Sequence, residues 1–362
     1  MTDPRATADP LVNADPLATA DPLVTVVVVT WQGAHLLGDC LDSLRRQTVP
    51  VAVLVVDNAS TDATPQVLAA HPEAQVLRSP RNVGFAGGCA LALAELRTPY
   101  AVLLNNDAVA EPDLVEALLA AAQRDPRRGA VTAKVLLADR FRPDPDGPVV
   151  LADGTRARSS PDGFAVVNST GNEVRTDGLG QDRGWLVPDD GRHYPEQVFG
   201  FCGAAALLRT DAVREAGGFD PRYFLYYEDT DLSWRLRLLG WDVTYAADAV
   251  VHHRHAASSQ EGSDLHRFHD QRNHLLTVVK CAPARLAAAA VGRSLLTAAS
   301  GVRREGPPWP RTRLRLRALA STARLLPHAL RARRELSRRA VRDRDEVARL
   351  LVPVTGGAAY RR

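Results

Sequence analysis

A run of β-branched residues near the start of the chain constrains the fold more than any other feature of the sequence. Val24-Thr-Val-Val-Val-Val-Thr30 has a β-branched side chain at every position and no charged one. A strand of this kind is buried on both faces, as in parallel sheets that are covered by helices on both sides. The run therefore predicts a central strand of an α/β sheet, with ordered structure beginning at residue 24.

The following hundred residues alternate between strand-like and helix-like patterns. Short apolar runs predict strands, and apolar residues three and four positions apart predict helices. The predicted strands are 51–56, 74–78 and 100–104, and the predicted helices are 36–46, 63–70, 89–96 and 113–124. Alternation of this regularity predicts an α/β fold with a doubly wound, mostly parallel sheet and helices on both faces.

Changes in composition divide the chain into three parts. Residues 1–23 contain a repeated Ala-Asp-Pro-Leu unit, whose prolines block a helix and whose leucines are too few for a core, so we predict a disordered leader. Residues 24–262 carry the α/β pattern and form the predicted main domain. Residues 263–362 combine helical spacing with many arginines, which predicts a helical, Arg-rich C-terminal extension.

The second part of the main domain, residues 136–262, is richer in loops. Residues 171–185 form one long Gly- and Asp-rich segment, and long loops in compact domains often act as lids, so we predict a folded lid. Residues 198–208 form a predicted strand of small residues. Its Gly203 and Ala204 would let a ligand approach the backbone closely.

Polar segments follow the predicted strands of the first part. Asp57 ends the second strand, Asn82–Gly88 follows the third, and Asn105-Asn-Asp107 ends the fourth. Each segment can be explained as a turn or a helix start, and the glycines lack the spacing of a P-loop or a dinucleotide motif. In sheets of this class, however, ligands bind at the carboxyl ends of the strands. The coincidence of all three segments at one edge predicts a binding site there.

Three carboxylates lie within four residues at Glu228, Asp229 and Asp231. One explanation is a helix start, where acids are favoured by the free N–H groups and the helix dipole. That explanation does not account for the aromatic residues before them, which are Tyr223, Phe224, Tyr226 and Tyr227. A carboxylate beside apolar surface has a raised pKa, which suits a general base. We therefore predict a catalytic acid–base centre here.

Histidines at 252, 253 and 255 directly follow an apolar strand-like segment. They can be surface residues or can contribute a metal ligand. If the sheet edge holds a nucleotide diphosphate, its charge must be balanced, and the sequence has no P-loop lysine. A divalent cation held by Asp107 and one of these histidines would supply that balance.

The cysteines and the hydrophobic segments indicate the compartment. The four cysteines are far apart and lack metal-ligand spacing, which predicts buried free thiols in a reducing environment. The start of the chain lacks the basic and apolar regions of a signal peptide, and no apolar run is long enough to span a bilayer. With a formal net charge of +3 on 362 residues, we expect a cytoplasmic protein.

Arginines alternate with leucine and alanine beyond residue 310. One interpretation is a solvated helix packed on the domain, and the other is attachment to the anionic inner leaflet of the plasma membrane. Nucleic acid is a poorer partner, because no aromatic residues are interleaved with the arginines.

Several of these motifs, in this order, resemble family 2 glycosyltransferases of the GT-A fold, and most of all a bacterial rhamnosyltransferase-like branch. The resemblance covers about residues 24–280. The segments that carry it are Thr-Val-Val-Val-Val-Thr-Trp, Val-Val-Asp57-Asn, Asn82-Val-Gly-Phe-Ala-Gly-Gly, Leu-Leu-Asn-Asn-Asp107, Gly203-Ala-Ala and Tyr-Glu228-Asp229-Thr-Asp-Leu-Ser-Trp-Arg. It implies inverting transfer of a sugar, rhamnose being one candidate, from a nucleoside diphosphate donor to a hydroxyl of a cell-wall, polysaccharide or lipid-linked acceptor.

The resemblance also implies roles for individual residues. Residues 24–135 would form the nucleotide-binding half and 136–262 the lid and acceptor half. Asp229 would be the general base with Glu228 beside it, and Asp107 with His253 would bind Mg²⁺ or Mn²⁺. The expected nucleotide-sugar-binding residues are Thr30, Trp31, Asp57, Asn82, Gly84, Gly87, Asn106 and Asp107, and the expected acceptor-binding residues are Gly203, Ala204 and Trp234.

One departure from the family pattern concerns the metal. The acidic motif that ends the fourth strand reads Asn105-Asn106-Asp107 and so retains a single carboxylate, which puts strict metal dependence in question. The choice of base between Glu228 and Asp229 stays open, as does the choice of histidine. Two rival functions are a sugar-nucleotide pyrophosphorylase, whose basic phosphate loop is missing, and a non-catalytic sugar-nucleotide-binding or membrane-associated scaffold protein.

Overall fold

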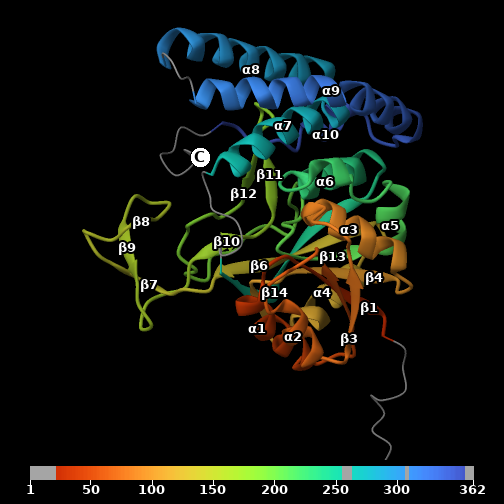
Figure 1. Ribbon diagram of the computed structural model, residues 1–362, viewed down its shortest axis with the longest axis vertical. Coiled ribbons are helices and arrows are strands. Elements are labelled where there is room, and N and C mark those ends of the chain that lie inside the picture. Colours follow the sequence, from red (N-terminus) through yellow and green to blue (C-terminus); the bar gives the residue numbers. More distant parts are fainter. Residues whose placement is uncertain (1–21, 255–262, 306–309, 355–362) are drawn as a thin grey trace, which may run out of the picture.

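A nine-stranded sheet organises the computed structural model, which describes residues 22–254, 263–305 and 310–354 (Figure 1). The strands follow the order β3-β2-β1-β4-β13-β6-β14-β5, and β10 pairs with β6. Their bounds are β1 (Val24–Thr30), β2 (Ala52–Asp57), β3 (Ala74–Arg78), β4 (Tyr100–Asn105), β5 (Ala108–Ala110), β6 (Arg128–Leu137), β10 (Val167–Ser169), β13 (Ala205–Arg209) and β14 (Asp242–His253). The predicted leader lies outside the described residues except for positions 22 and 23.

The two halves of this sheet differ in strand direction. The predicted parallel arrangement holds for β1, β2, β3 and β4, with β1 at the centre. Beyond β4 the sheet is mixed, because β13 runs antiparallel to β4 and to β6, whereas β14 is parallel to β6. A parallel neighbour needs a crossover connection, usually a helix. The chain between β6 and β13 contains only short strands and turns in place of a helix.

Helices cover both faces of the sheet, as the apolar run of β1 predicts. One face carries α1 (Ala34–Arg45), α2 (Thr64–Ala69) and α4 (Leu114–Gln123), and the other carries α3 (Gly84–Glu95), α5 (Thr210–Glu215) and α6 (Glu228–Leu238). Alternate residues of β1 enter the two cores: Val26 and Val28 pack with α1 and α4, and Val27 and Val29 pack with α3. The strand is therefore buried on both sides.

Between β6 and β13 the chain leaves the main sheet twice. A small three-stranded sheet of β7 (Phe141–Pro143), β8 (Val149–Val150) and β9 (Arg156–Ser159) projects from the body (Figure 1). Next comes a hairpin of β11 (Asn172–Val174) and β12 (Gly180–Asp182). The predicted lid, residues 171–185, contains this hairpin and is an ordered structure.

The C-terminal part is helical, with α7 (Asp264–Cys281), α8 (Ala284–Glu305), α9 (Pro310–Arg339) and α10 (Arg344–Ala348). Helix α7 packs against α6, α8 and α9, and its Leu275 and Val278 enter the core that contains α3 and α6. In Figure 1 these helices lie above α6 on that side of the sheet. None of the described helices is both long enough and apolar enough to cross a lipid bilayer.

Two element boundaries differ from the sequence prediction in a way that matters for the site. Helix α3 begins at Gly84, so the predicted Gly-rich turn is the first turn of the helix. The predicted strand 198–208 is regular only over Ala205–Arg209. Gly203 and Ala204 therefore lie in the irregular segment that enters β13 from the sheet edge, where small residues allow close approach of other groups.

Candidate active site

A cavity of about 620 Å³ opens at the carboxyl ends of β1 and β4, within the size range of small-molecule sites. Its walls come from the sheet edge, the start of α3, the β11–β12 hairpin, the segment before α6, and the start of α7. The cavity lies where the polar segments of the sequence predict a ligand site.

The sheet edge supplies a group of hydrogen-bonded amides. Asn106 Nδ2 donates to Thr30 Oγ1 over 3.0 Å, which joins the ends of β4 and β1. Asn58, buried at the end of β2, donates from Nδ2 to the carbonyl of Gly84 over 3.0 Å and so positions the first turn of α3. Gly84 has φ +74°, and a Cβ there would lie 2.2 Å from the carbonyl oxygen of Phe224. Only glycine fits this contact.

Asp107 and His253 form the pair that suits a cation. Both side chains are buried, and His253 Nε2 lies 3.0 Å from Asp107 Oδ1. His253 Nδ1 lies 2.7 Å from Asn168 Oδ1, a contact that favours the proton on Nδ1. If Nδ1 carries the only ring proton, the lone pair of Nε2 faces the carboxylate oxygen, and a cation between the two groups would stabilise that arrangement.

The choice among the three histidines follows from the strand period of β14. His253 lines the cavity, whereas His252 points to the other face and bonds Glu111 with its Nε2 over 2.8 Å. His255 lies outside the described residues. Within the described part of the chain, no three His, Cys, Asp or Glu side chains gather into one metal cluster. Asp107 and His253 could supply two ligands to a hard cation, and substrate phosphate and water would then complete its coordination.

The segment before α6 has an unusual backbone. Phe224 has φ 64° and ψ −62°, and the N–H of Leu225 donates to the carbonyl of Tyr223 over 2.7 Å, which defines a γ-turn with positive φ. Tyr226 and Tyr227 also have positive φ values of 68° and 67°. Left-handed conformations at non-glycine residues cost about 1–3 kcal/mol each and persist where surrounding contacts impose them.

Glu228 and Asp229 begin α6 immediately after this segment and line the cavity. Burial, and then the charge of Asp182, raises the pKa of Asp229 to about 6, although the N–H of Gly203 donates to its Oδ2 over 3.2 Å. Burial and the charge of Asp229 raise the pKa of Glu228 well above its usual value. Within the described residues, Glu228 Oε2 is buried without a hydrogen-bond partner. The pair thus suits an ionised Asp229 beside a protonated Glu228.

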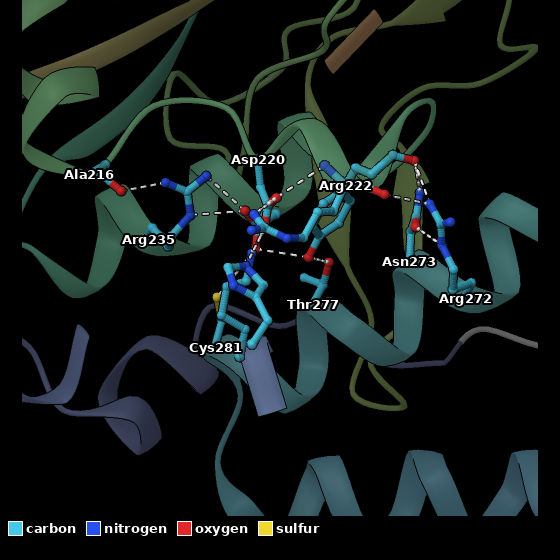
Figure 2. A network of polar contacts seen from close by, with 12 residues as sticks. Ala216, Asp220, Arg222, Arg235, Arg272, Asn273, Thr277 and Cys281 are labelled. Atoms are coloured by element: carbon cyan, nitrogen blue, oxygen red, sulfur yellow. Dashed lines mark hydrogen bonds and ion pairs between the residues drawn. The ribbon is translucent and has the colours of Figure 1, made fainter. Parts of the chain in front are cut away.

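Asp231, two residues further on, belongs to a different environment, the network of polar contacts that includes Arg235 and Asp220 (Figure 2). Its carboxylate is fully buried, and it lies 2.7 Å from the guanidinium of Arg235 and 3.0 Å from Lys280 Nζ. Burial alone would raise its pKa, but Arg235 and then Lys280 bring the pKa below the usual value. Lys280 also pairs with Asp220, so this network joins α6, α7 and the segment before α6.

The β11–β12 hairpin is attached to the first turn of α6 and to the segment before it. Asn172 Nδ2 donates to Thr230 Oγ1 over 2.9 Å, and the N–H of Gly180 donates to Tyr227 Oη over 3.0 Å. The hairpin also brings Asp182 into the cavity wall. It therefore closes the cavity beside Glu228 and Asp229 and contributes to their charge environment.

The cavity is lined by more acidic than basic side chains. Five carboxylates line it, and the described lining includes neither lysine nor arginine. The five are Asp107, Asp182, Glu228, Asp229 and Asp270. An anionic ligand such as a diphosphate would be repelled here unless a cation accompanied it.

Most of the site residues expected from the sequence line this cavity. They are Thr30, Trp31, Asn82, Gly84, Asn106, Asp107, Gly203, Ala204, Glu228, Asp229 and His253. Asp57 lies at the same sheet edge but is buried behind the wall, where its Oδ1 accepts from the N–H of Ser60 over 2.9 Å. Gly87 lies within α3 and is not among the cavity residues; a Cβ at this position would contact the side chain of Val83.

Trp234 requires a correction. It was expected to bind the acceptor, but its side chain is fully buried in the core, edge to face with Phe199 at a centroid distance of 5.3 Å. Its position on α6 turns the ring toward the core and away from the cavity. An acceptor cannot contact it.

Several cavity residues were missed from the sequence. Asn58 follows Asp57 directly, and Asp182 lies in the predicted lid, so both had a local signal. No local sequence pattern identified Asn168 or the α7 residues His266 and Asp270, because only the fold brings those segments to the sheet edge.

Comparisons with known proteins agree with this architecture. Residues 25–143 match Glycosyl transferase family 2, and residues 189–274 match Glycosyl transferase family group 2. The N-acetylglucosaminyl-diphospho-decaprenol L-rhamnosyltransferase of Mycobacterium tuberculosis is 31% identical over 271 residues, which cover 67% of this chain and 80% of that protein.

Solved structures show the same fold at low sequence identity. S. aureus TarS 1-349 has a TM-score of 0.50 at 14% identity and covers 90% of this chain and 89% of its own. GalNAc-T7 has a TM-score of 0.55 at 13% identity and covers 82% of this chain and 54% of its own.

The fold is that of the GT-A glycosyltransferases, with a helical C-terminal region added. The chain belongs to glycosyl transferase family 2 and is similar to its rhamnosyltransferases. It is a glycosyltransferase that uses nucleotide sugar donors.

Proposed function

We propose that this enzyme is an inverting, cation-dependent glycosyltransferase that moves a sugar, with rhamnose as the first candidate, to a hydroxyl of a lipid-linked saccharide. The observation that carries the proposal is the single cavity lined by both the Asp107–His253 pair and the Glu228–Asp229 pair. The candidate donor and acceptor classes come from the mycobacterial relative, whose name specifies a rhamnosyl transfer to a decaprenol-linked acceptor.

The cation would be Mg²⁺ or Mn²⁺ held by Asp107 and His253. When bound, it would neutralise the donor diphosphate and stabilise the departing nucleoside diphosphate. The absence of lysine and arginine from the described lining supports this role, because the lining then holds no permanently charged cation to balance the diphosphate. GalNAc-T7, a fold neighbour, was crystallised with UDP, GalNAc and Mn²⁺.

Asp229 is the proposed general base. Its pKa of about 6 leaves it ionised at neutral pH and still basic enough to accept a proton from the acceptor hydroxyl. That oxygen forms a bond to the anomeric carbon as the bond to the diphosphate oxygen breaks on the opposite side, which inverts the configuration. The proton stays on Asp229 Oδ and later passes to solvent. Glu228, held neutral by its burial, would donate a hydrogen bond within the cavity.

A donor screen tests the proposal. The purified chain is incubated with nucleoside diphosphate sugars, including deoxythymidine diphosphate rhamnose, with Mg²⁺, Mn²⁺ or EDTA, and release of nucleoside diphosphate is measured with and without a prenyl-diphosphate saccharide. We expect acceptor-stimulated release from one donor, lost in EDTA and in Asp107→Ala. Tight donor binding without any release would support the alternative of a non-catalytic sugar-nucleotide-binding scaffold.

We also propose peripheral attachment to an anionic membrane through α8 and α9, which would bring the cavity to a lipid-linked acceptor. Helix α9 has ten arginines and one acid. Leu295 and Leu296 of α8 and Leu326 and Leu330 of α9 are exposed. Basic helices with exposed leucines bind anionic lipid surfaces. Flotation with phosphatidylglycerol vesicles is expected, and flotation with neutral vesicles is not; equal recovery in both would contradict the charge-based attachment.

A further inference from the structure

The γ-turn before α6 is held from one side by two neighbouring residues of α7. Asn273 is fully buried, and its Nδ2 lies within hydrogen-bond distance of three backbone carbonyls, those of Tyr223 at 2.9 Å, Leu225 at 2.8 Å and Tyr226 at 2.8 Å. The two hydrogens of the amide are thus shared among carbonyls of the segment with positive φ values (Figure 2).

Arg272 fixes the orientation of that amide. Its Nε donates to Asn273 Oδ1 over 2.8 Å, so the amide nitrogen must face the carbonyls. Its Nη2 donates to the carbonyls of Arg222 and Tyr223, both over 2.8 Å. Arg272 is itself buried, so its donors have little access to water. The carbonyls of Arg222, Leu225 and Tyr226 therefore receive their donors from α7, and the carbonyl of Tyr223 receives donors from α7 in addition to the N–H of Leu225.

The segment held in this way connects both ends of the active site. The carbonyl of Phe224 accepts from the N–H of Ala86 in the first turn of α3, over 3.1 Å. The carbonyl of Tyr227 accepts from the N–H of Asp231 over 2.8 Å, which starts α6 directly at Glu228 and Asp229. Any relaxation of the γ-turn would therefore shift the donor-side helix start and the catalytic carboxylates together.

We propose that Asn273 and Arg272 are positioning residues of the glycosyl transfer, so that α7 determines the geometry of the active site. They hold the segment in which Phe224, Tyr226 and Tyr227 have positive φ values and thereby direct Asp229 into the cavity. Without these donors, buried carbonyls would lose their partners and the strained residues would relax to ordinary backbone conformations. This inference rests on the proposed role of Asp229 as base.

Asn273→Asp is the main variant, because it keeps the shape of the side chain but replaces the donor by an acceptor. Arg272→Lys keeps the charge and removes the planar group that orients Asn273. Thr277→Val is the matched control. Thr277 lies on the same helix in the same network, but its hydroxyl bonds the Tyr223 side chain, over 2.9 Å, and no backbone carbonyl of the segment.

Three measurements are made on the full chain: kcat and donor KM, the melting temperature, and hydrogen exchange of the amides from Leu225 to Asp229. Both α7 variants are expected to lower kcat about 10- to 100-fold, since small displacements of a reacting group have effects of this size, and to raise donor KM by a smaller factor, since the start of α3 shifts as well. They should also speed exchange of those amides. Thr277→Val should lower only the melting temperature.

Unchanged kcat and exchange in Asn273→Asp would overturn the inference, as would an equal loss of kcat in Thr277→Val. If Asn273→Asp does not fold, Arg272→Lys carries the same comparison. If the wild-type chain releases no nucleoside diphosphate from any donor, the proposed function fails, and the exchange measurement still tests whether α7 holds the segment.

Discussion

The first turn of α6 presents carboxylates to two environments that treat them in opposite ways. Asp229 faces a cavity with other acids and neither lysine nor arginine among the described lining residues, and its pKa rises to about 6. Asp231 faces Arg235 and Lys280, and its pKa falls below the usual value. Two residues along a helix differ by about 200° in direction. Within a single turn of helix, Asp229 is therefore suited to proton transfer, whereas Asp231 stabilises the fold.

The contrast shows that the clustering of acids in a sequence says little about their roles. Glu228, Asp229 and Asp231 are all largely or wholly withdrawn from water, so desolvation opposes ionisation in each. What differs is the neighbour that each one meets. Asp231 gains two cations from α6 and α7, whereas Glu228 and Asp229 mainly meet each other and Asp182.

The largest expected effect comes from Asp229→Asn. This change removes the proposed base and should lower kcat by about 10²–10⁴-fold. Donor affinity should remain within about threefold by calorimetry, since Asp107 and His253 are untouched. The melting temperature at pH 7.5 should not fall, because a carboxyl with a raised pKa is ionised there at a cost to the folded state. A variant with near wild-type kcat would shift the role of base to Glu228.

Asp231→Asn should produce the opposite pattern. The ionised carboxylate stabilises the fold above its unfolded pKa, and this stabilisation is lost as pH falls through the lower folded-state value. Removing one partner of a buried ion pair lowers the free energy of unfolding by about 3–5 kcal/mol. We expect a strong fall in melting temperature at neutral pH, with kcat per folded molecule reduced far less than in Asp229→Asn. Equal stability of the two variants would remove the distinction between the two environments.

A smaller effect is expected at the cation pair. Asn168→Ala removes the acceptor that orients His253 and should weaken Mg²⁺- or Mn²⁺-dependent donor binding by about 10- to 100-fold. His252→Ala is the control, because its ring bonds Glu111 outside the cavity. Titration of the metal at a fixed donor concentration distinguishes the Asn168→Ala variant from the His252→Ala control. Identical metal curves for Asn168→Ala and wild type would contradict an oriented His253.

The sequence was sufficient for groups that directly follow a strand or start a helix. Asp107 follows β4, and Asp229 starts α6, so local pattern placed both at the correct end of an element. The period of β14 could also have selected His253 over His252, since alternate residues face opposite sides. The parallel half of the sheet was predictable for the same reason, because its strands alternate with helices along the chain.

Side chains that reach the site only through long-range contacts could not be predicted from the sequence. Asn168 reaches His253 across 85 positions, and Asn273 reaches Tyr223 across 50 positions. No repeating sequence pattern connects such residues. In the mixed half of the sheet, the chain between β6 and β13 also lacks the helical crossover from which strand order can be predicted. The prediction that Trp234 binds the acceptor was wrong. Trp234 is close to Asp229 in sequence, but its position on the helix directs its side chain into the core. Tertiary contacts decide these positions.

The smallest effect tests the charge environment of the cavity itself. Asp182 lies in the hairpin wall and is the second cause, after burial, of the raised pKa of Asp229. If Asp229 is the base, as proposed, it must be ionised, and activity should rise with pH through a midpoint near 6 in the wild type. Asp182→Asn removes a negative neighbour and should move that midpoint to lower pH by a fraction of a unit. Asp177→Asn, at the tip of the same hairpin where Asp177 pairs with Arg175, should leave the midpoint in place. An unchanged midpoint in Asp182→Asn would mean that Asp182 does not influence the pKa of Asp229, and that burial alone raises it.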